Sequence, residues 1–313
     1  MTSVVTRSGT VGRPLPRATI GRVTDPDDTP QWFLDAVARR PEHADVDVEG
    51  AAVHYRAWGD AGRPGLVLVH GGAANSGWWD HVAPFFADRY RVVAVDLSGH
   101  GDSGRRPAYD LEQWAREVLA VGIAGGIAGP PLVVGHSMGG WVTTTVGARH
   151  GEDVDGIVIV DSPLNEQPPE EERLRRSTRE HRYYPDRETM VRRYRTTPAQ
   201  DVMLPYVRRH IAEQSVRETP QGWTWKFDPS IFAERELLRD LLPEVKCRAG
   251  FLRSEFGLVP PTMAGEIDAL LGHRVPIIDL PASGHHPMLD QPLCLVTALR
   301  ALLGQWAVDD ADL

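Results

Sequence analysis

Short apolar runs alternate with helix-like stretches along most of this chain, starting at Leu66. The runs are four to six residues long and include Leu66–Val69, Val92–Val95, Pro131–Gly135 and Ile157–Val160. Continuous apolar runs of this length are typical of strands that are buried on both faces, and such strands are usually parallel and covered by crossover helices. The pattern therefore predicts an α/β protein that has a mostly parallel sheet with helices on both faces.

One of these runs leads into a serine between two glycines, in the segment Gly135-His136-Ser137-Met138-Gly139. The stretch from Met138 to His150 is helix-like, so Ser137 stands at a strand-to-helix turn. Such a turn is so sharp that the positions two before and two after the serine are restricted to glycine or a residue nearly as small. Ser137 is therefore predicted to project its hydroxyl above the sheet as a nucleophile. The alternative is a glycine-rich turn with an ordinary serine.

Four motifs, taken in order, resemble those of the α/β-hydrolase family, and the resemblance extends from about Ala44 to Trp306. They are residues 66–72 (LVLVHGG), residues 92–103 (VVAVDLSGHGDS), the turn at residues 135–139, and Gly284-His285-His286-Pro287 near the C-terminus. The order and spacing of four motifs are far more specific than any single motif. The resemblance implies an α/β-hydrolase fold, with a core made of residues 29–161 and 246–313.

The N-terminal part is expected to differ from the rest. Residues 1–28 are rich in Pro, Gly, Thr and Arg and are expected to form a flexible arm. Thr29-Pro30 resembles the start of a short amphipathic helix. Two strands, Ala44–Val48 and Ala52–Trp58, are predicted to follow and to pair through a tight turn at Glu49-Gly50.

The alternation is interrupted between Asp161 and Lys246, where about eighty residues separate two predicted strands. This distance is too long for an ordinary crossover connection. In the α/β-hydrolase family an insertion at this place is a helical cap over the active site, so residues 162–245 are expected to form a cap after strand six. The arginines of this segment are either solvated helix faces or a carboxylate-binding patch. Its aromatic residues either pack onto the core or line a pocket.

A serine hydroxyl is a very weak acid, so Ser137 must lose its proton to a positioned base as it attacks a carbonyl. His285 is our candidate for this base, since it matches the family's histidine and lies before the last predicted helix. His286 is expected to point elsewhere. His70, His100 and His136 belong to turn motifs and are expected to be structural.

Two backbone N–H groups are expected to hold the oxyanion that develops on the substrate, because such donors are oriented before the reaction. One is that of Met138, at the head of the predicted helix. By resemblance to the family, the other is that of Gly72, for which a simple turn glycine is the alternative reading.

The acid of the triad has two candidates in this chain. The family's commonest pattern places an aspartate after strand seven, and this chain has none there. Asp161, at the end of strand six, and Glu255, in the loop that follows the predicted strand from Cys247 to Arg253, are the two candidates. We favour Asp161 and keep Glu255 as the alternative. Asp161 could instead cap a turn, since Asp-Ser-Pro is a good turn opener.

These residues together predict a serine hydrolase that cleaves a small or medium-sized, partly apolar carboxylic ester through an acyl-serine intermediate. Lactone, amide, thioester and carbon–carbon bond hydrolysis, and cofactor-free perhydrolysis, remain alternatives with the same triad. Epoxide and haloalkane cleavage are disfavoured, because the family's route to them needs an aspartate at the position of Ser137. A ligand-binding receptor on the same fold is the non-enzymatic alternative.

Composition limits the remaining possibilities. The chain has 313 residues and a net charge of -9, which argues against a nucleic-acid or anionic-membrane partner. Cys247 and Cys294 lie in a predicted strand and a predicted helix, so neither a disulfide framework nor a metal site is expected. No signal peptide or membrane span is recognised, and we expect a cytoplasmic, bacterial enzyme that acts on a small molecule without a cofactor. The sequence makes no prediction of the oligomeric state.

Overall fold

The computed structural model describes residues 29–164, 182–232, 237–273 and 275–311. Eight of the described strands form one sheet in the order β1-β2-β4-β3-β5-β6-β9-β10. The pairs β1–β2 and β2–β4 are antiparallel, and every other neighbouring pair is parallel. The predicted α/β architecture is therefore confirmed. The strands are β1 (Glu42–Val48), β2 (Ala51–Trp58), β3 (Pro64–Val69), β4 (Arg91–Val95), β5 (Ala128–His136), β6 (Gly156–Val160), β9 (Ala249–Phe256) and β10 (Ile277–Gly284).

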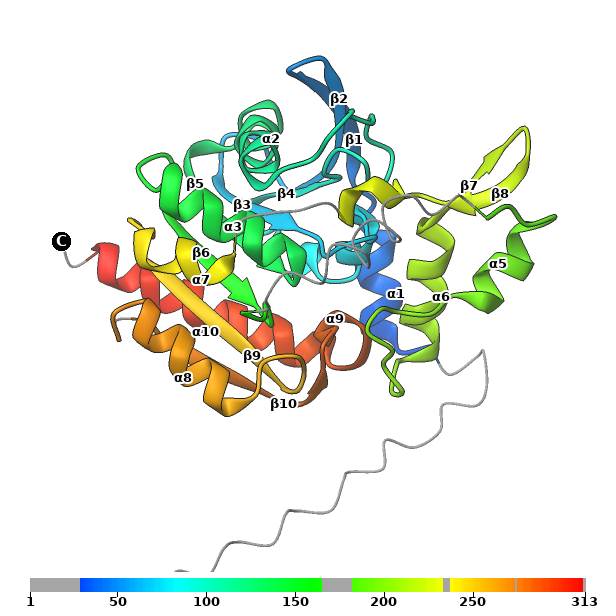
Figure 1. Cartoon of the computed structure of the whole chain (residues 1–313). Helices are drawn as coiled ribbons and strands as arrows, with labels where there is room; N and C mark the ends of the chain where they lie inside the picture. Colours follow the sequence, from blue (N-terminus) through cyan, green and yellow to red (C-terminus); the bar gives the residue numbers. More distant parts are fainter. Residues whose placement is uncertain (1–28, 165–181, 233–236, 274, 312–313) are drawn as a thin grey trace, which may run out of the picture.

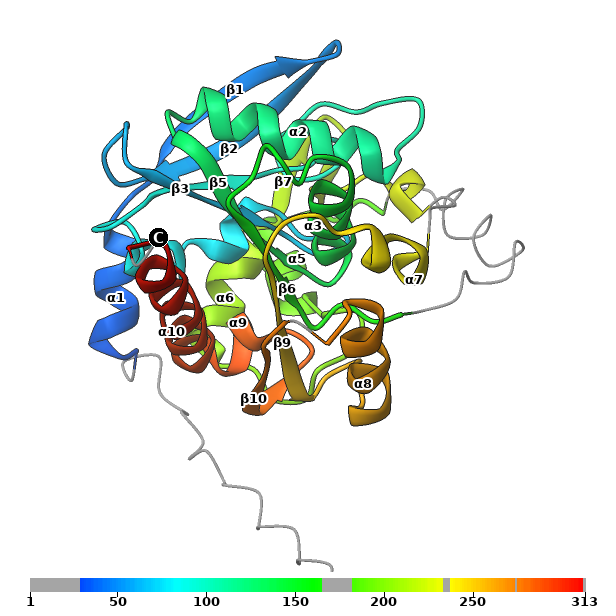
Figure 2. The same ribbon diagram turned by 90° about the vertical axis from the view of Figure 1, so that its left-hand side faces the viewer.

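Helices cover both faces of this sheet, as Figures 1 and 2 show. Apolar residues of α1 and α10 pack on one face, and those of α2, α3, α7 and α8 pack on the other. Because side chains alternate along a strand, Leu66 and Leu68 join the first cluster while Val67 and Val69 join the second. These helices are α1 (Gln31–Ala38), α2 (Leu111–Ala124), α3 (Met138–Arg149), α7 (Leu238–Leu241), α8 (Pro261–Leu270), α9 (Pro287–Asp290) and α10 (Pro292–Ala311).

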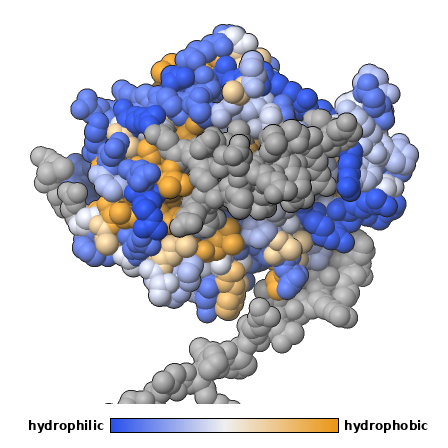
Figure 3. Space-filling model, in the orientation of Figure 1, coloured by the Kyte–Doolittle hydropathy of each residue, from blue (hydrophilic) through white to orange (hydrophobic). Residues whose placement is uncertain are grey.

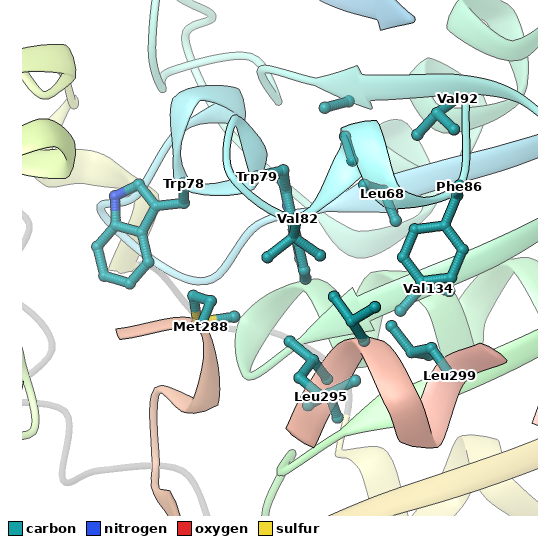
Figure 4. Packing of buried hydrophobic residues seen from close by; sticks show 14 of the residues in the cluster. Leu68, Trp78, Trp79, Val82, Phe86, Val92, Val134, Met288, Leu295 and Leu299 are labelled. Atoms are coloured by element: carbon teal, nitrogen blue, oxygen red, sulfur yellow. The ribbon is translucent and has the colours of Figure 1, made fainter. Parts of the chain in front are cut away.

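The core on the α10 face extends from the sheet to the loops at its carboxyl edge. Figure 4 shows Leu295 and Leu299 of α10 beside Val134 of β5. The same cluster includes Trp78 of the 3-10 helix η2 (Ser76–Trp79) and Met288 of α9, two short helices from different parts of the chain. These short helices are thus held by the same apolar packing that holds the sheet. A further 3-10 helix of the region is η3 (Ala83–Phe85).

The side chain of Asp110 accepts a hydrogen bond from Gln113 N and caps the start of α2. The predicted N-terminal hairpin is confirmed, with boundaries shifted by a few residues. The hairpin of β1 and β2 turns at Glu49 and Gly50, which both have positive φ. Cys247 was expected inside a strand, but β9 begins at Ala249, where its ladder with β6 starts. An apolar run alone does not show at which residue such a ladder begins.

The described part of the predicted insertion contains more than helices. It includes a two-stranded antiparallel hairpin that the sequence analysis did not anticipate. The described elements of residues 162–245 are α5 (Arg187–Arg193), α6 (Pro205–Gln214), β7 (Val216–Thr219), β8 (Gly222–Trp225), η4 (Pro229–Phe232), α7 (Leu238–Leu241) and η5 (Leu242–Glu244). In Figure 1, α5, α6, β7 and β8 lie together to the right of the main sheet, beside α1. Residues 1–28, the expected arm, and residues 165–181 and 233–236 of the expected cap lie outside the described residues.

The surface of the described residues is mostly hydrophilic on the face that Figure 3 shows, with apolar side chains gathered over α3 and α7. Among the residues that the structure describes, no helix is both long and apolar enough to cross a membrane.

Candidate active site

Ser137 lies at the sharp turn between β5 and α3. Its φ is 54° and its ψ is -119°, a conformation that non-glycine residues rarely adopt. A Cβ atom on Gly139 would lie 2.5 Å from the carbonyl oxygen of His70, so the packing permits only glycine at this position. The turn is held further by Ser162, whose Oγ donates a hydrogen bond to Ser137 O at 2.8 Å. The structure thus has the strained, closely packed turn that the sequence predicts.

His285 follows β10 directly and lies between Ser137 and Asp161. Its Nδ1–H donates to Asp161 Oδ2 at 2.7 Å, because the carboxylate can only accept. In the neutral imidazole Nε2 is then the acceptor, and it lies 3.0 Å from Ser137 Oγ, whose hydroxyl donates to it. His285 is 4 % exposed. Three side chains from the ends of β5, β6 and β10 therefore form one continuous hydrogen-bonded chain.

Asp161 is completely buried at the end of β6, next to the strand that carries Ser137. Besides His285, it accepts hydrogen bonds from the backbone N–H groups of Ser254 at 3.2 Å and Leu258 at 2.9 Å. A Cβ atom on Gly257 would lie 2.2 Å from Asp161 Oδ2, so a glycine is needed there. The loop after β9 thus wraps around this carboxylate and supplies it with two backbone donors.

Glu255, the alternative candidate, does not reach the histidine. Its Oε2 accepts a hydrogen bond from Ala282 N at 2.8 Å, and the residue is exposed. The expectation that Glu255 lies in a loop was wrong, since β9 extends to Phe256. Because alternate side chains of a strand point to opposite sides, the extension of β9 through Ser254, Glu255 and Phe256 fixes the side to which Glu255 points.

The other histidines of the motifs lie where they can stabilise loops. His70 Nδ1–H donates to Gly71 O at 2.8 Å, and its Nε2 accepts from Leu97 N at 3.2 Å. His136 Nε2–H donates to the carbonyl oxygen of His285 at 2.8 Å, which ties the Ser137 turn to the loop of His285. Burial, and secondarily the nearby His285, lowers the pKa of His136 well below its ordinary value, so that its ring is neutral.

The ring of His286 packs against an aromatic ring. Its ring lies edge-on to Trp78, with a distance of 5.4 Å between the ring centroids. Burial, with a smaller contribution from His285, lowers its pKa to about 3. Its imidazole is therefore neutral at ordinary pH.

Gly72 and Met138, the candidate oxyanion donors, are neighbours. A Cβ atom on Gly72 would lie 3.6 Å from Met138 Sδ and 3.6 Å from a ring carbon of Phe232, which belongs to the predicted insertion. Met138 is the first residue of α3, and the N–H group of such a residue has no partner within its helix. The two residues lie at the same edge of the sheet as Ser137.

Two groups of described residues have side-chain atoms close enough together to hold a metal ion. One is His136, His285 and His286, and the other is His54, Asp96 and Asp102. In the first group, the ring nitrogens of His285 already bind Ser137 and Asp161. In the second, Asp96 already accepts hydrogen bonds from the ring of His54 and from two backbone N–H groups. Neither arrangement requires an ion to explain it.

Comparison with known proteins identifies the family to which this protein belongs. The model of the Alpha/beta hydrolase family matches residues 66–299, so the chain belongs to this family and is a hydrolase of it. The crystal structure of E-2-(acetamidomethylene)succinate hydrolase aligns with a TM-score of 0.72 at 20 % identity, over 84 % of this chain and 99 % of that one. The predicted α/β-hydrolase fold is thereby confirmed.

Two curated relatives align over most of their length. The pimeloyl-[acyl-carrier protein] methyl ester esterase of Vibrio atlanticus is 29 % identical over 237 residues, which cover 73 % of this chain and 90 % of the relative. Esterase Rv0045c of Mycobacterium tuberculosis is 27 % identical over 266 residues, which cover 82 % of this chain and 88 % of the relative. The chain is therefore similar to esterases.

The sequence analysis missed the residues that support the carboxylate of Asp161. These are the backbone donors of Ser254 and Leu258 and the small residue Gly257 between them. Gly257 was the one available signal, since a glycine directly after a strand often marks a close approach of the backbone to another group.

Proposed function

We propose that this protein hydrolyses carboxylic esters of small or medium-sized, partly apolar acids through an acyl-serine intermediate. The observation that carries the proposal is the single imidazole of His285, bonded to Ser137 Oγ at 3.0 Å and to Asp161 at 2.7 Å. A serine nucleophile, a base and an oriented carboxylate are the groups that acyl transfer requires.

In the proposed reaction, Ser137 Oγ attacks the ester carbonyl carbon while its proton passes to His285 Nε2. The negative charge that moves to the carbonyl oxygen is held by the backbone N–H groups of Gly72 and Met138. The imidazolium then gives its proton to the departing alcohol, and the acyl group stays on Ser137. A water molecule, deprotonated by His285, releases the acid in the same way. Asp161 holds the ring in the required tautomer and stabilises its charged form.

Residues 162–245 are proposed to form a cap beside this site. Phe232 lies against Gly72, and Trp225 and Tyr194 pack edge-on with ring centroids 6.0 Å apart. Tyr194 is 5 % exposed, so this ring serves packing, whereas Trp225 is only half-buried. The ring of Phe232 beside Gly72 suits a partly apolar acyl group. The esterase names of both relatives support an ester as the substrate class, with acyl methyl esters as the first to test.

The test is turnover of p-nitrophenyl esters, acyl methyl esters and lactones by the wild type and by Ser137→Ala. We expect ester hydrolysis by the wild type and a loss on the order of 10⁴ to 10⁶ in the variant, since the attacking atom is removed. The thermal midpoint should change little, because a hydroxyl is lost without much packing. A variant that keeps a tenth of the wild-type rate contradicts the mechanism. Labelling of Ser137 by a fluorophosphonate without turnover of any ester would instead favour a ligand-binding receptor.

A further inference from the structure

The loop that carries His285 is bonded to the predicted cap segment by the side chain of Gln200. Gln200 Oε1 accepts a hydrogen bond from His286 N at 2.8 Å. Gln200 Nε2 donates to His286 O at 3.4 Å and to Val202 O at 3.1 Å. The amide group therefore binds both the backbone N–H and the backbone carbonyl of His286, the residue that follows the candidate base.

Packing around this amide is close. A Cβ atom on Gly284 would lie 2.6 Å from Gln200 Cδ, so the glycine before His285 makes room for the glutamine. A few residues further on, Leu204 N donates to Leu289 O at 2.8 Å. The stretch from Gln200 to Leu204 is thus bonded at two places, to His286 in the loop of His285 and to Leu289 in the following helix α9.

From these contacts we infer that Gln200 is a positioning residue, which sets the orientation of the His285 loop and ties it to the predicted cap segment. This inference rests on the proposed function, in which His285 is the base. Proton transfer from Ser137 depends on an Nε2-to-Oγ distance of 3.0 Å, and a displacement of the ring by about 1 Å is enough to slow such a step strongly. Only an amide can donate and accept at this place, because a carboxylate accepts only and a thioether does neither well.

Three variants separate this role from simple packing. Gln200→Met keeps the volume over Gly284 and removes both hydrogen bonds to His286 and the one to Val202 O, whereas Gln200→Glu keeps the acceptor for His286 N. Gln221→Met is the matched control, since Gln221 is exposed in the turn between β7 and β8. We expect kcat to fall about tenfold in Gln200→Met with KM changed less than about twofold, because the lost contacts act on the reacting groups and not on substrate binding.

The kcat of Gln200→Glu should lie between that of Gln200→Met and that of the wild type. Its pH profile of kcat/KM should also move to higher pH, because a carboxylate near an imidazole favours the imidazolium. All rates are compared at a temperature where thermal unfolding shows every variant folded. Wild-type kcat in Gln200→Met, or an equal loss in Gln221→Met, overturns the inference.

Labelling of Ser137 by a fluorophosphonate distinguishes a failure of this inference from a failure of the proposed function. The labelling rate depends on the activation of Ser137 and not on the correct ester. If the wild type is labelled but hydrolyses no ester, and Gln200→Met is labelled about tenfold more slowly, the positioning role stands while the ester function fails. Equal labelling rates in both proteins overturn the positioning role.

Discussion

Asp161 shows how much of this site depends on backbone groups rather than on side chains. Its carboxylate is completely buried, and it accepts hydrogen bonds from the ring of His285 and from two backbone N–H groups. A buried carboxylate without such donors would be costly. Its φ of 45° directs the side chain toward them, in a region that aspartate adopts more readily than most residues. The same contacts thus account for the strained backbone of Asp161 and for the fixed ring of His285.

Replacing this carboxylate by its amide tests the proposed role of Asp161. Asp161→Asn should lower kcat by about 10⁴-fold, because an amide supports the wrong tautomer of the imidazole. Steady-state kinetics on a p-nitrophenyl ester measures the loss. Glu255→Gln is the control, since Glu255 bonds Ala282 N and not His285. It should lower kcat by no more than about tenfold, the equivalent of one pKa unit. The opposite order of the two losses would assign the acid to Glu255.

The junction of β5 and α3 is the element on which the candidate site depends most. It brings a strand end, a strained serine and the first N–H of a helix within a few residues of one another. The neighbouring strands then supply the other groups, since β6 ends at Asp161 and the loop after β10 begins with His285. The carboxyl ends of parallel strands meet at one edge of a sheet, which is where α/β proteins place their ligands.

Two helix glycines give a matched test of this junction. In Gly139→Ala the new Cβ would lie 2.5 Å from His70 O and 2.6 Å from Val69 O, both backbone atoms that cannot move aside. We expect a loss of at least about 2 kcal/mol in the free energy of unfolding, from overpacking. Gly304→Ala in α10 would place its Cβ in open space and should stabilise the protein by about 0.5–1 kcal/mol. Urea unfolding measures both, and equal effects would contradict the packing argument.

The elements that the sequence predicts well are those whose pattern is local. The apolar runs of β3 to β6 are confirmed as strands within a few residues. The sequence also predicted Ser137, His285 and Asp161 as candidates, and the structure places the three in contact. Their catalytic roles remain proposals.

The features that the sequence did not predict depend on contacts between distant segments. The β7–β8 hairpin is short, and its polar pattern resembles that of a loop. Whether Glu255 or Asp161 faces His285 depends on how far the ladder between β9 and β10 extends, which no local pattern encodes. The bonds of Gln200 to His286 join residues 86 positions apart, so only the tertiary structure reveals them.

At the scale of the whole molecule, buried polar groups attach the predicted cap segment to the core. Arg56 of β2 donates to both carboxylate oxygens of Asp80 at 2.8 Å and to Gln214 of α6 at 2.9 Å. His210 of α6 also bonds Asp80, at 2.9 Å. A buried ion pair contributes little net stability, but loss of one partner is costly because it leaves the other charge unpaired. The network therefore fixes where α6 lies more than it stabilises the fold.

Several imidazoles are buried in their neutral form, and this sets how the stability of the molecule depends on pH. His81 is completely buried, and it donates from Nε2 to Met288 O at 2.7 Å. Burial lowers its pKa from 6.5 to about 4. The pKa of His286 is lowered to about 3 for the same reason. In contrast, burial raises the pKa of Asp290 to about 6, which acts in the opposite direction.

The sign of the histidine effect follows from proton binding. Between pH 6.5 and pH 4 the unfolded chain binds a proton at the position of His81 and the folded chain does not, so stability is lost as the pH falls through this window. The loss between pH 7 and pH 5 is about 2 kcal/mol for this one group.

His81→Gln removes the titrating group and keeps a donor. We therefore expect its free energy of unfolding to fall less on acidification than that of the wild type, by about 2 kcal/mol. His273→Gln is the control, because the side chain of His273 is 69 % exposed. Urea unfolding at pH 7 and pH 5 measures the three proteins. The same pH dependence in wild type and His81→Gln would show that His81 is protonated inside the folded protein.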